Sequence, residues 1–356
     1  MPSILLSVLL LILGLVILIF SGDALVRGAT NIAYKMKLSP LVVGLTIVAF
    51  GTSAPELIVS LKSVLSGKAS LGMGNVVGSN ICNLSLVLGS TALVYPIFVK
   101  NASVKIDWIV AFGSSLLLFF FIGAERNHAN EIMHLLNRFE GIILFLILVI
   151  YTYFLIENSR KEVMEKEAAG LPIAEEDEME DVENAMKSKN IVELGFILIG
   201  CVGLYFGGEM FVENAADLAA LFGNATTEQE IIDQQAMIGA TVVAFGTSAP
   251  ELVTSIIAAR KKNTDLALGN LLGSCIFNVL SILGLTAIIA PGGIVVEDTL
   301  VSRDMLMMLG VILLVLPMMI SRKKITAIEG GLLLVVYVMY VSFKITEILR
   351  PDLIPL

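Results

Sequence analysis

Long apolar stretches alternate with short polar segments along the whole chain. Most of these stretches reach about the 20 residues that an α-helix needs to cross a bilayer. The pattern predicts ten membrane-spanning helices, at residues 4–22, 40–65, 70–95, 107–124, 139–156, 191–221, 236–259, 266–290, 304–320 and 326–349. Residues 157–190 differ, because they are rich in acidic side chains, including the run Glu175–Glu178, and cannot enter a bilayer. We expect a solvated linker there, between two groups of five helices.

The two groups of helices contain an internal repeat. Residues 48–57 and 243–252 both read VAFGTSAPEL, and the match continues at a constant offset from Gly74/Gly269 to Asn83/Asn278. The second copy carries an insertion near residues 226–234. Because five crossings is an odd number, the second copy must enter the membrane from the opposite face. Inverted repeats of this kind are typical of secondary transporters, which bind their substrates at the midplane between the repeats.

The repeat predicts an all-α membrane protein with ten transmembrane helices, arranged as two inverted five-helix repeats. Helices 2, 3, 7 and 8 are expected to be broken at the midplane, where the repeated motifs lie. The first repeat is expected to cover residues 1–156, with its motif at 41–89, and the linker residues 157–190. The second repeat is expected to cover residues 191–356, with its motif at 236–284.

Composition agrees with a membrane protein, since 56% of the residues are hydrophobic and only 15% are charged, against about 25% in soluble domains. The net charge of −9 weighs against a nucleic-acid partner. Lys and Arg concentrate in the loops of one side, notably at residues 35–37, 260–262 and 322–324. By the positive-inside rule, we expect a multi-pass protein of the inner or plasma membrane with a cytoplasmic acidic linker and both termini outside.

Two carboxylates lie inside apolar spans at equivalent positions of the repeat. Glu56 and Glu251 each follow a proline directly, and a proline removes a helix hydrogen bond and frees a backbone carbonyl nearby. A carboxylate at this depth costs at least a few kcal/mol, which makes it a candidate functional group. A kinked helix with a protonated glutamate would explain one copy, but two symmetric copies favour a binding site.

Neutral oxygen donors accompany both carboxylates. The two motifs supply hydroxyls, and the spans that follow them supply a further hydroxyl and an amide, at Thr52, Ser53, Ser79 and Asn83 in the first half and at Thr247, Ser248, Ser274 and Asn278 in the second. Oxygen donors without His or Cys at matching positions indicate a hard cation. Two carboxylates balance the charge of one Ca²⁺ or of two monovalent cations.

The paired GTSAPE and GNxxGSxxxN motifs resemble the two alpha repeats of the cation/calcium exchanger superfamily, in its sodium/calcium exchanger branch. The short linker resembles that of prokaryotic-type members. The resemblance implies an antiporter, not an enzyme, that moves Ca²⁺ against Na⁺ by alternating access and needs no cofactor. Its partners would be the lipid bilayer and the two transported ions.

The resemblance also implies roles for residues of the motifs. Glu56 and Glu251 would coordinate Ca²⁺ together with the carbonyls of Thr52 and Thr247. The same glutamates would bind Na⁺ with further hydroxyls and carbonyls, those of Ser53, Ser248, Ser79, Ser274, Ala49 and Ala244. Asn278 stands where many members carry an aspartate, which argues against potassium co-transport.

Two other functions stay open at this point. A H⁺/Ca²⁺ antiporter could share the fold, because carboxylates can release Ca²⁺ on protonation, although the serine and asparagine donors favour Na⁺. A calcium-gated channel or sensor could use the acidic linker as its detector. Stoichiometry, direction of transport and oligomeric state are not predicted.

Overall fold

The computed structural model describes residues 4–66, 69–99, 104–122, 124–126, 132–169, 187–222, 244–296, 298 and 300–349. Residues 175–178 of the acidic run, the insertion near 226–234 and residues 236–243 of the second motif lie outside this part of the chain. Within it, eight helices are long and apolar enough to cross a membrane, and a bent pair of helices raises the number to as many as nine. The seventh predicted span is described only from Ala244 onward.

The first half follows the predicted order of helices, with additional short elements between them. Its longest helices are α1 (Ile4–Met36) and α8 (Arg138–Ala168), which both extend well beyond the predicted spans. The other elements are α2 (Pro40–Val43), the π-helical segment η1 (Gly44–Val48), α3 (Ala49–Thr52), α4 (Ala54–Leu65), α5 (Ala69–Cys82), the π-helical segment η2 (Asn83–Val87), α6 (Leu88–Val94), β1 (Ile97–Phe98), α7 (Val104–Phe121), β2 (Ala124–Arg126) and β3 (Ile132–Leu136).

The described part of the second half follows a similar order of long helices. It begins with α10 (Asn190–Phe222), a helix as long as α1. It continues through α12 (Ala244–Thr247), α13 (Ala249–Arg260), α14 (Thr264–Phe277), the π-helical segment η5 (Asn278–Leu283), α15 (Gly284–Ile289), β4 (Ile294–Val296), the π-helical segment η6 (Leu300–Asp304), α16 (Met305–Ser321), β5 (Lys324–Ile325) and α17 (Ala327–Leu349).

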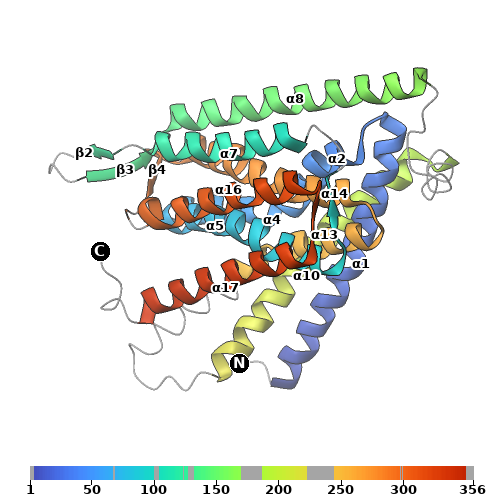
Figure 1. Cartoon of the computed structure of the whole chain (residues 1–356). Helices are drawn as coiled ribbons and strands as arrows, with labels where there is room; N and C mark the ends of the chain where they lie inside the picture. The colour runs from blue at the N-terminus through green and yellow to red at the C-terminus, as the bar shows by residue number, and fades with distance from the viewer. Residues whose placement is uncertain are drawn as a thin grey trace.

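The centre of the molecule is formed by the third helix of each half. In the helices over Leu71–Val94 and Thr264–Ile289, 78% of the most apolar stretch is buried, against 22–28% in α1, α8 and α10. The outer helices therefore present apolar side chains outward, as a bilayer requires. α1 and α10 pack side by side along much of their length and project from the bundle (Figure 1).

The predicted break in helix 2 is present, whereas the breaks predicted in helices 3 and 8 are not. The axis bends by 47° between Pro40–Thr52 and Ala54–Leu65, and α12 and α13 are likewise separated at Ser248. Helices 3 and 8 instead run on through η2 and η5. Neither helix contains a proline. The backbone therefore widens locally into a π turn and keeps its hydrogen bonds.

Two small sheets lie at opposite ends of the bundle. β1 pairs with β5, and β2, β3 and β4 form the second sheet. α7 runs from β1 to β2 and has 18 residues, a length of about 27 Å, while α16 makes the corresponding connection between β4 and β5. Strands from both halves therefore meet at each end of the bundle.

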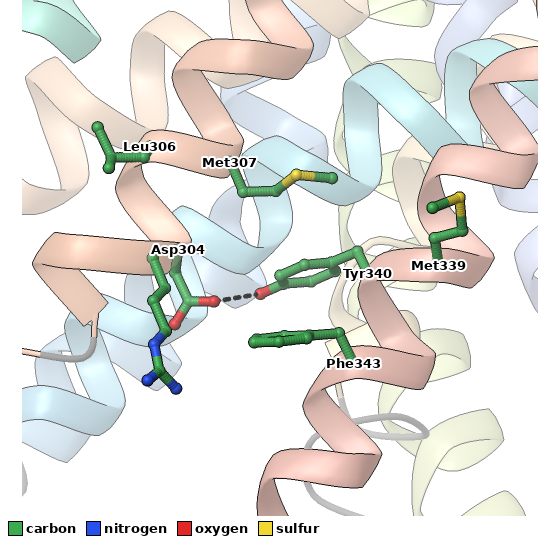
Figure 2. Close-up of a pocket in the computed structure, with 7 residues that line it drawn as sticks. Asp304, Leu306, Met307, Met339, Tyr340 and Phe343 are labelled. Carbon is green, nitrogen blue, oxygen red and sulfur yellow. Dashed lines mark hydrogen bonds between the residues drawn. The ribbon is translucent and has the colours of Figure 1, made fainter. Parts of the chain in front are cut away.

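An aspartate–tyrosine hydrogen bond occurs at related places in the two halves. Tyr151 on α8 donates to Asp107 Oδ1 over 2.8 Å, and Tyr340 on α17 donates to Asp304 Oδ1 over 3.2 Å (Figure 2). The surroundings differ, because Asp304 also pairs with Lys344. Asp107 is fully buried, and its Oδ2 has no hydrogen-bond partner among the described residues.

Removing the two tyrosine hydroxyls should therefore have unequal effects on stability. Tyr151→Phe deprives a buried carboxyl of its hydrogen bond, which should lower the free energy of unfolding by about 1–3 kcal/mol. Tyr340→Phe leaves Asp304 paired with Lys344 and should cost less than about 1 kcal/mol. Thermal unfolding of the two variants in one detergent measures the difference, and equal shifts would contradict this account of Asp107.

Candidate functional site

Each of the two repeated motifs ends one helix and starts another at the same residue. Ser53 has φ −85° and ψ 6°, and Ser248 has φ −88° and ψ 4°. Proline two residues later has no N–H to donate four residues back. The carbonyls that lose this bond are those of Gly51 and Gly246. Glu56 and Glu251 thus enter the first turns of α4 and α13, where the helix dipole favours a negative charge.

Both glutamates are completely buried, and each makes use of only one carboxylate oxygen. Ser79 donates to Glu56 Oε1 over 3.4 Å, and the equivalent Ser274 donates to Glu251 Oε1 over the same distance. The Oε2 atoms of both glutamates have no hydrogen-bond partner among the described residues. Buried carboxylate oxygens without a partner are costly, and a bound cation would satisfy them.

Hydrogen bonds between side chains link the two halves directly at the site. Ser53 Oγ donates to Glu251 Oε1 over 3.0 Å. Thr52 Oγ1 donates to Asn270 Oδ1 over 3.1 Å. Asn278 Nδ2 donates to Asn80 Oδ1 over 2.9 Å. The residues predicted from the two motifs therefore converge on one region instead of forming two separate sites.

The remaining predicted residues lie around this region. Asn83 and Asn278 are the first residues of η2 and η5, and π segments of this kind often occur at functional sites. Neither polar atom of the Asn83 side chain has a partner among the described residues, and the same holds for Ser248 Oγ. Thr247 is also buried.

Two predicted carbonyl donors belong to the helices before the breaks. The carbonyl of Ala49 accepts hydrogen bonds from Ser53 N, over 3.0 Å, and from Thr52 Oγ1, over 3.3 Å. Ala244, its equivalent, is the first residue of α12. The Ala49 carbonyl is therefore already occupied in this arrangement, and an ion that binds it must share it or displace these donors.

A second pair of asparagines supports the site and was not among the predicted residues. Asn75 Nδ2 donates to Ser60 Oγ over 3.1 Å, and Asn270 Nδ2 donates to Ser255 Oγ over 3.0 Å. These bonds tie α5 to α4 and α14 to α13 in the same way. Both asparagines belong to the repeated GN pair, so the repeat contained a signal for them, although not for their partners.

Glycine lets a helix of the second half approach the first motif closely. A Cβ atom on Gly44 of η1 would lie 2.6 Å from the carbonyl oxygen of Leu266 on α14. A side chain there would push the two helices apart. Gly44 therefore allows the close contact between η1 and α14 that helps to place Asn270 against Thr52.

The chemistry of the site is that of neutral oxygens around two carboxylates. In the described parts of the chain, no three or more His, Cys, Asp or Glu side chains gather in a way that could hold a metal ion. Hydroxyl, amide and carbonyl oxygens with two carboxylates suit Ca²⁺ or Na⁺.

A pocket of about 490 Å³ is lined by other residues of the second half (Figure 2). Its polar groups are already paired: besides the bonds of Asp304, Arg303 Nη1 lies 2.7 Å from Glu347 Oε1. None of the predicted site residues lines it. The lining consists of Arg303, Asp304, Leu306, Met307, Met339, Tyr340 and Phe343.

Known proteins resemble the chain over nearly its whole length. The sequence profile of the family described as sodium/calcium exchanger protein matches residues 6–157 and 192–346. The sodium/calcium exchanger MaX1 of Methanosarcina acetivorans is 30% identical and covers 93% of this chain and 96% of its own. The inner membrane protein YrbG of Escherichia coli is 32% identical and covers 86% of each chain.

Solved structures resemble it as well. One structure of the sodium-calcium exchanger NCX_Mj, soaked with zero Na⁺ and Ca²⁺, has a TM-score of 0.74 and 26% identity. The alignment covers 96% of this chain and 99% of that one. The similarity therefore extends to both halves and is not confined to one motif.

The two motif serines should differ in their contribution to stability. Ser53→Ala removes a hydrogen bond to the buried Glu251 and should lower the free energy of unfolding by about 1–3 kcal/mol. Ser248→Ala removes a hydroxyl that has no hydrogen-bond partner within the geometric limits among the described residues, and it should cost less. Thermal unfolding in buffer free of Na⁺ and Ca²⁺ measures both, and a Ser248→Ala variant that loses as much stability as Ser53→Ala would argue against the asymmetry.

Proposed function

The chain belongs to the sodium/calcium exchanger family, and from that premise we propose that it exchanges Ca²⁺ for Na⁺ across a membrane by alternating access. Family membership confirms the resemblance inferred from the two motifs. The observation that carries the proposal is the pair of equivalent, fully buried glutamates, each with one oxygen that lacks a partner among the described residues.

The oxygen donors suggest how Ca²⁺ and Na⁺ can use one site. Glu56 and Glu251, with the carbonyls of Thr52 and Thr247, would hold Ca²⁺. The same carboxylates would hold Na⁺ with other neutral donors, those of Ser53, Ser248, Ser79, Ser274, Ala49 and Ala244. The amides of Asn83 and Asn278 complete the oxygen set. Because both loads need the carboxylates, Ca²⁺ and Na⁺ would compete.

Charge explains why such a site would exchange ions instead of leaking them. Two ionised carboxylates without a cation are expensive to enclose in a low-dielectric interior. The empty site should therefore change sides slowly, whereas the loaded site, with its charge balanced, can change sides readily. Net transport of one ion then requires return of the other, which is antiport.

The architecture that we propose is ten transmembrane helices in two inverted repeats. The matching breaks at Ser53 and Ser248, and the two sheets to which both halves contribute, support this arrangement. The division into residues 1–156, 157–190 and 191–356 accompanies it. The loop distribution of Lys and Arg supports a cytoplasmic linker and termini on the outside.

Neutralising either glutamate should stop exchange. Glu56→Gln and Glu251→Gln keep the size of the side chain but remove a charge that the ion needs. Na⁺-gradient-driven ⁴⁵Ca²⁺ uptake into proteoliposomes should fall by about 100-fold or more, since loss of one buried ionic partner costs roughly 3–5 kcal/mol. Asp107→Asn is the matched control, because it neutralises a buried carboxyl outside the site and keeps an acceptor for Tyr151.

The same assay separates the proposal from its rivals. If an imposed pH gradient drives Ca²⁺ uptake and a Na⁺ gradient does not, the protein is a H⁺/Ca²⁺ antiporter. A channel or sensor that depends on the acidic linker would lose its response on deletion of residues 162–187. The exchanger should retain gradient-driven uptake after that deletion.

A further inference from the structure

Asn80 and Cys275 are equivalent positions of the repeat, and they contact each other. Asn80 Nδ2 donates to the Cys275 carbonyl over 3.3 Å, and Cys275 Sγ lies 4.0 Å from the Asn80 carbonyl oxygen. A residue that touches its own equivalent must lie close to the axis that relates the two halves. Both side chains are buried there, between α5 and α14.

Different side chains on this axis make the two halves of the site unequal. Asn80 Oδ1 accepts a hydrogen bond of 2.9 Å from Asn278 Nδ2. Cys275 has no amide with which to bond Asn83 in the same way. Accordingly, Asn83 has two polar atoms without a partner among the described residues, whereas Asn278 has only its Oδ1.

The orientation of the Asn80 amide is determined by its other contacts. Its Nδ2 faces two acceptors, the Cys275 carbonyl and Met308 Sδ, the latter at 3.6 Å. A flipped amide would place an oxygen against both acceptors and an NH₂ group against that of Asn278. Only one orientation satisfies all of these groups. In this orientation the Asn278 Nδ2 is bonded to Asn80, and Asn278 Oδ1 is the side-chain atom that is available to a cation.

We propose that Asn80 is a positioning residue that orients the Asn278 amide toward the transported cation and excludes an ionised carboxylate at position 278. This inference rests on the exchange function proposed above. A carboxylate at position 278 would have no hydrogen to donate to Asn80 Oδ1 and would face that oxygen at hydrogen-bond distance. Asn80 would thereby limit the ionised carboxylates of the site to those of Glu56 and Glu251.

Three variants test the positioning role. Asn80→Ala removes the acceptor for Asn278 and should raise the Ca²⁺ concentration for half-maximal thermal stabilisation of the purified protein by about five- to tenfold. Cys275→Ala, at the equivalent position, removes a buried side chain but no hydrogen bond to Asn278. It should change that concentration by less than about twofold. Equal effects of the two substitutions would reduce Asn80 to a packing role and overturn the proposal.

The charge-excluding role is tested by rescue. Asn278→Asp alone should lose Na⁺-driven ⁴⁵Ca²⁺ uptake, because the new carboxylate faces Asn80 Oδ1. Asn80→Ser replaces this oxygen by a hydroxyl that can either accept or donate. The double variant Asn80→Ser/Asn278→Asp should therefore recover uptake by about tenfold or more over Asn278→Asp. Failure of this rescue overturns the proposal, and it does so even if Asn80→Ala does not fold.

Measurements on the wild-type protein distinguish a failure of this proposal from a failure of the proposed exchange function. A wild type that shows neither Ca²⁺-dependent stabilisation nor Na⁺-driven uptake contradicts the proposed function. A wild type that shows both, together with failed rescue or with equal effects of Asn80→Ala and Cys275→Ala, contradicts only the role of Asn80.

Discussion

Enclosure of two carboxylates in an apolar bundle is the constraint on which the rest of the structure depends. Glu56 and Glu251 are completely buried, and serine hydroxyls satisfy only one oxygen of each. Among the described residues, the side-chain hydrogen bonds to both carboxylates come from neutral serine hydroxyls. A charge pair of this kind is tolerable when a mobile cation neutralises it. The helix breaks, the close glycine crossing and the supporting asparagines all serve to hold these groups together.

The repeat makes the backbone of the two halves alike, while the side-chain contacts at the site differ. Ser53 bonds Glu251 across the interface, but Ser248 Oγ has no partner among the described residues. Asn80 and Cys275 meet on the axis with different chemistry. A symmetric scaffold thus supports an asymmetric set of ligands.

Sequence reasoning succeeded where the repeat supplied a second observation. The burial of Glu56 and Glu251, the interruptions of helices 2 and 7 and the membrane-spanning character follow from matched proline, glycine and apolar patterns. The role of the two glutamates as ion ligands stays a prediction. Sequence reasoning was wrong about breaks in helices 3 and 8, because the sequence pattern does not reveal a π turn that keeps its hydrogen bonds. It also missed Asn75, Asn270 and Asn80, since their roles depend on which helices meet, and a linear pattern does not contain that information.

The central claim is that both halves build one shared cation site. Equilibrium ⁴⁵Ca²⁺ binding to the purified wild type, to Glu56→Gln, to Glu251→Gln and to the double variant tests it most directly. A shared site predicts that each single substitution abolishes saturable binding as completely as the double one, and that Na⁺ displaces Ca²⁺ from the wild type. Single variants that each keep half of the wild-type sites would show two independent sites and contradict the account.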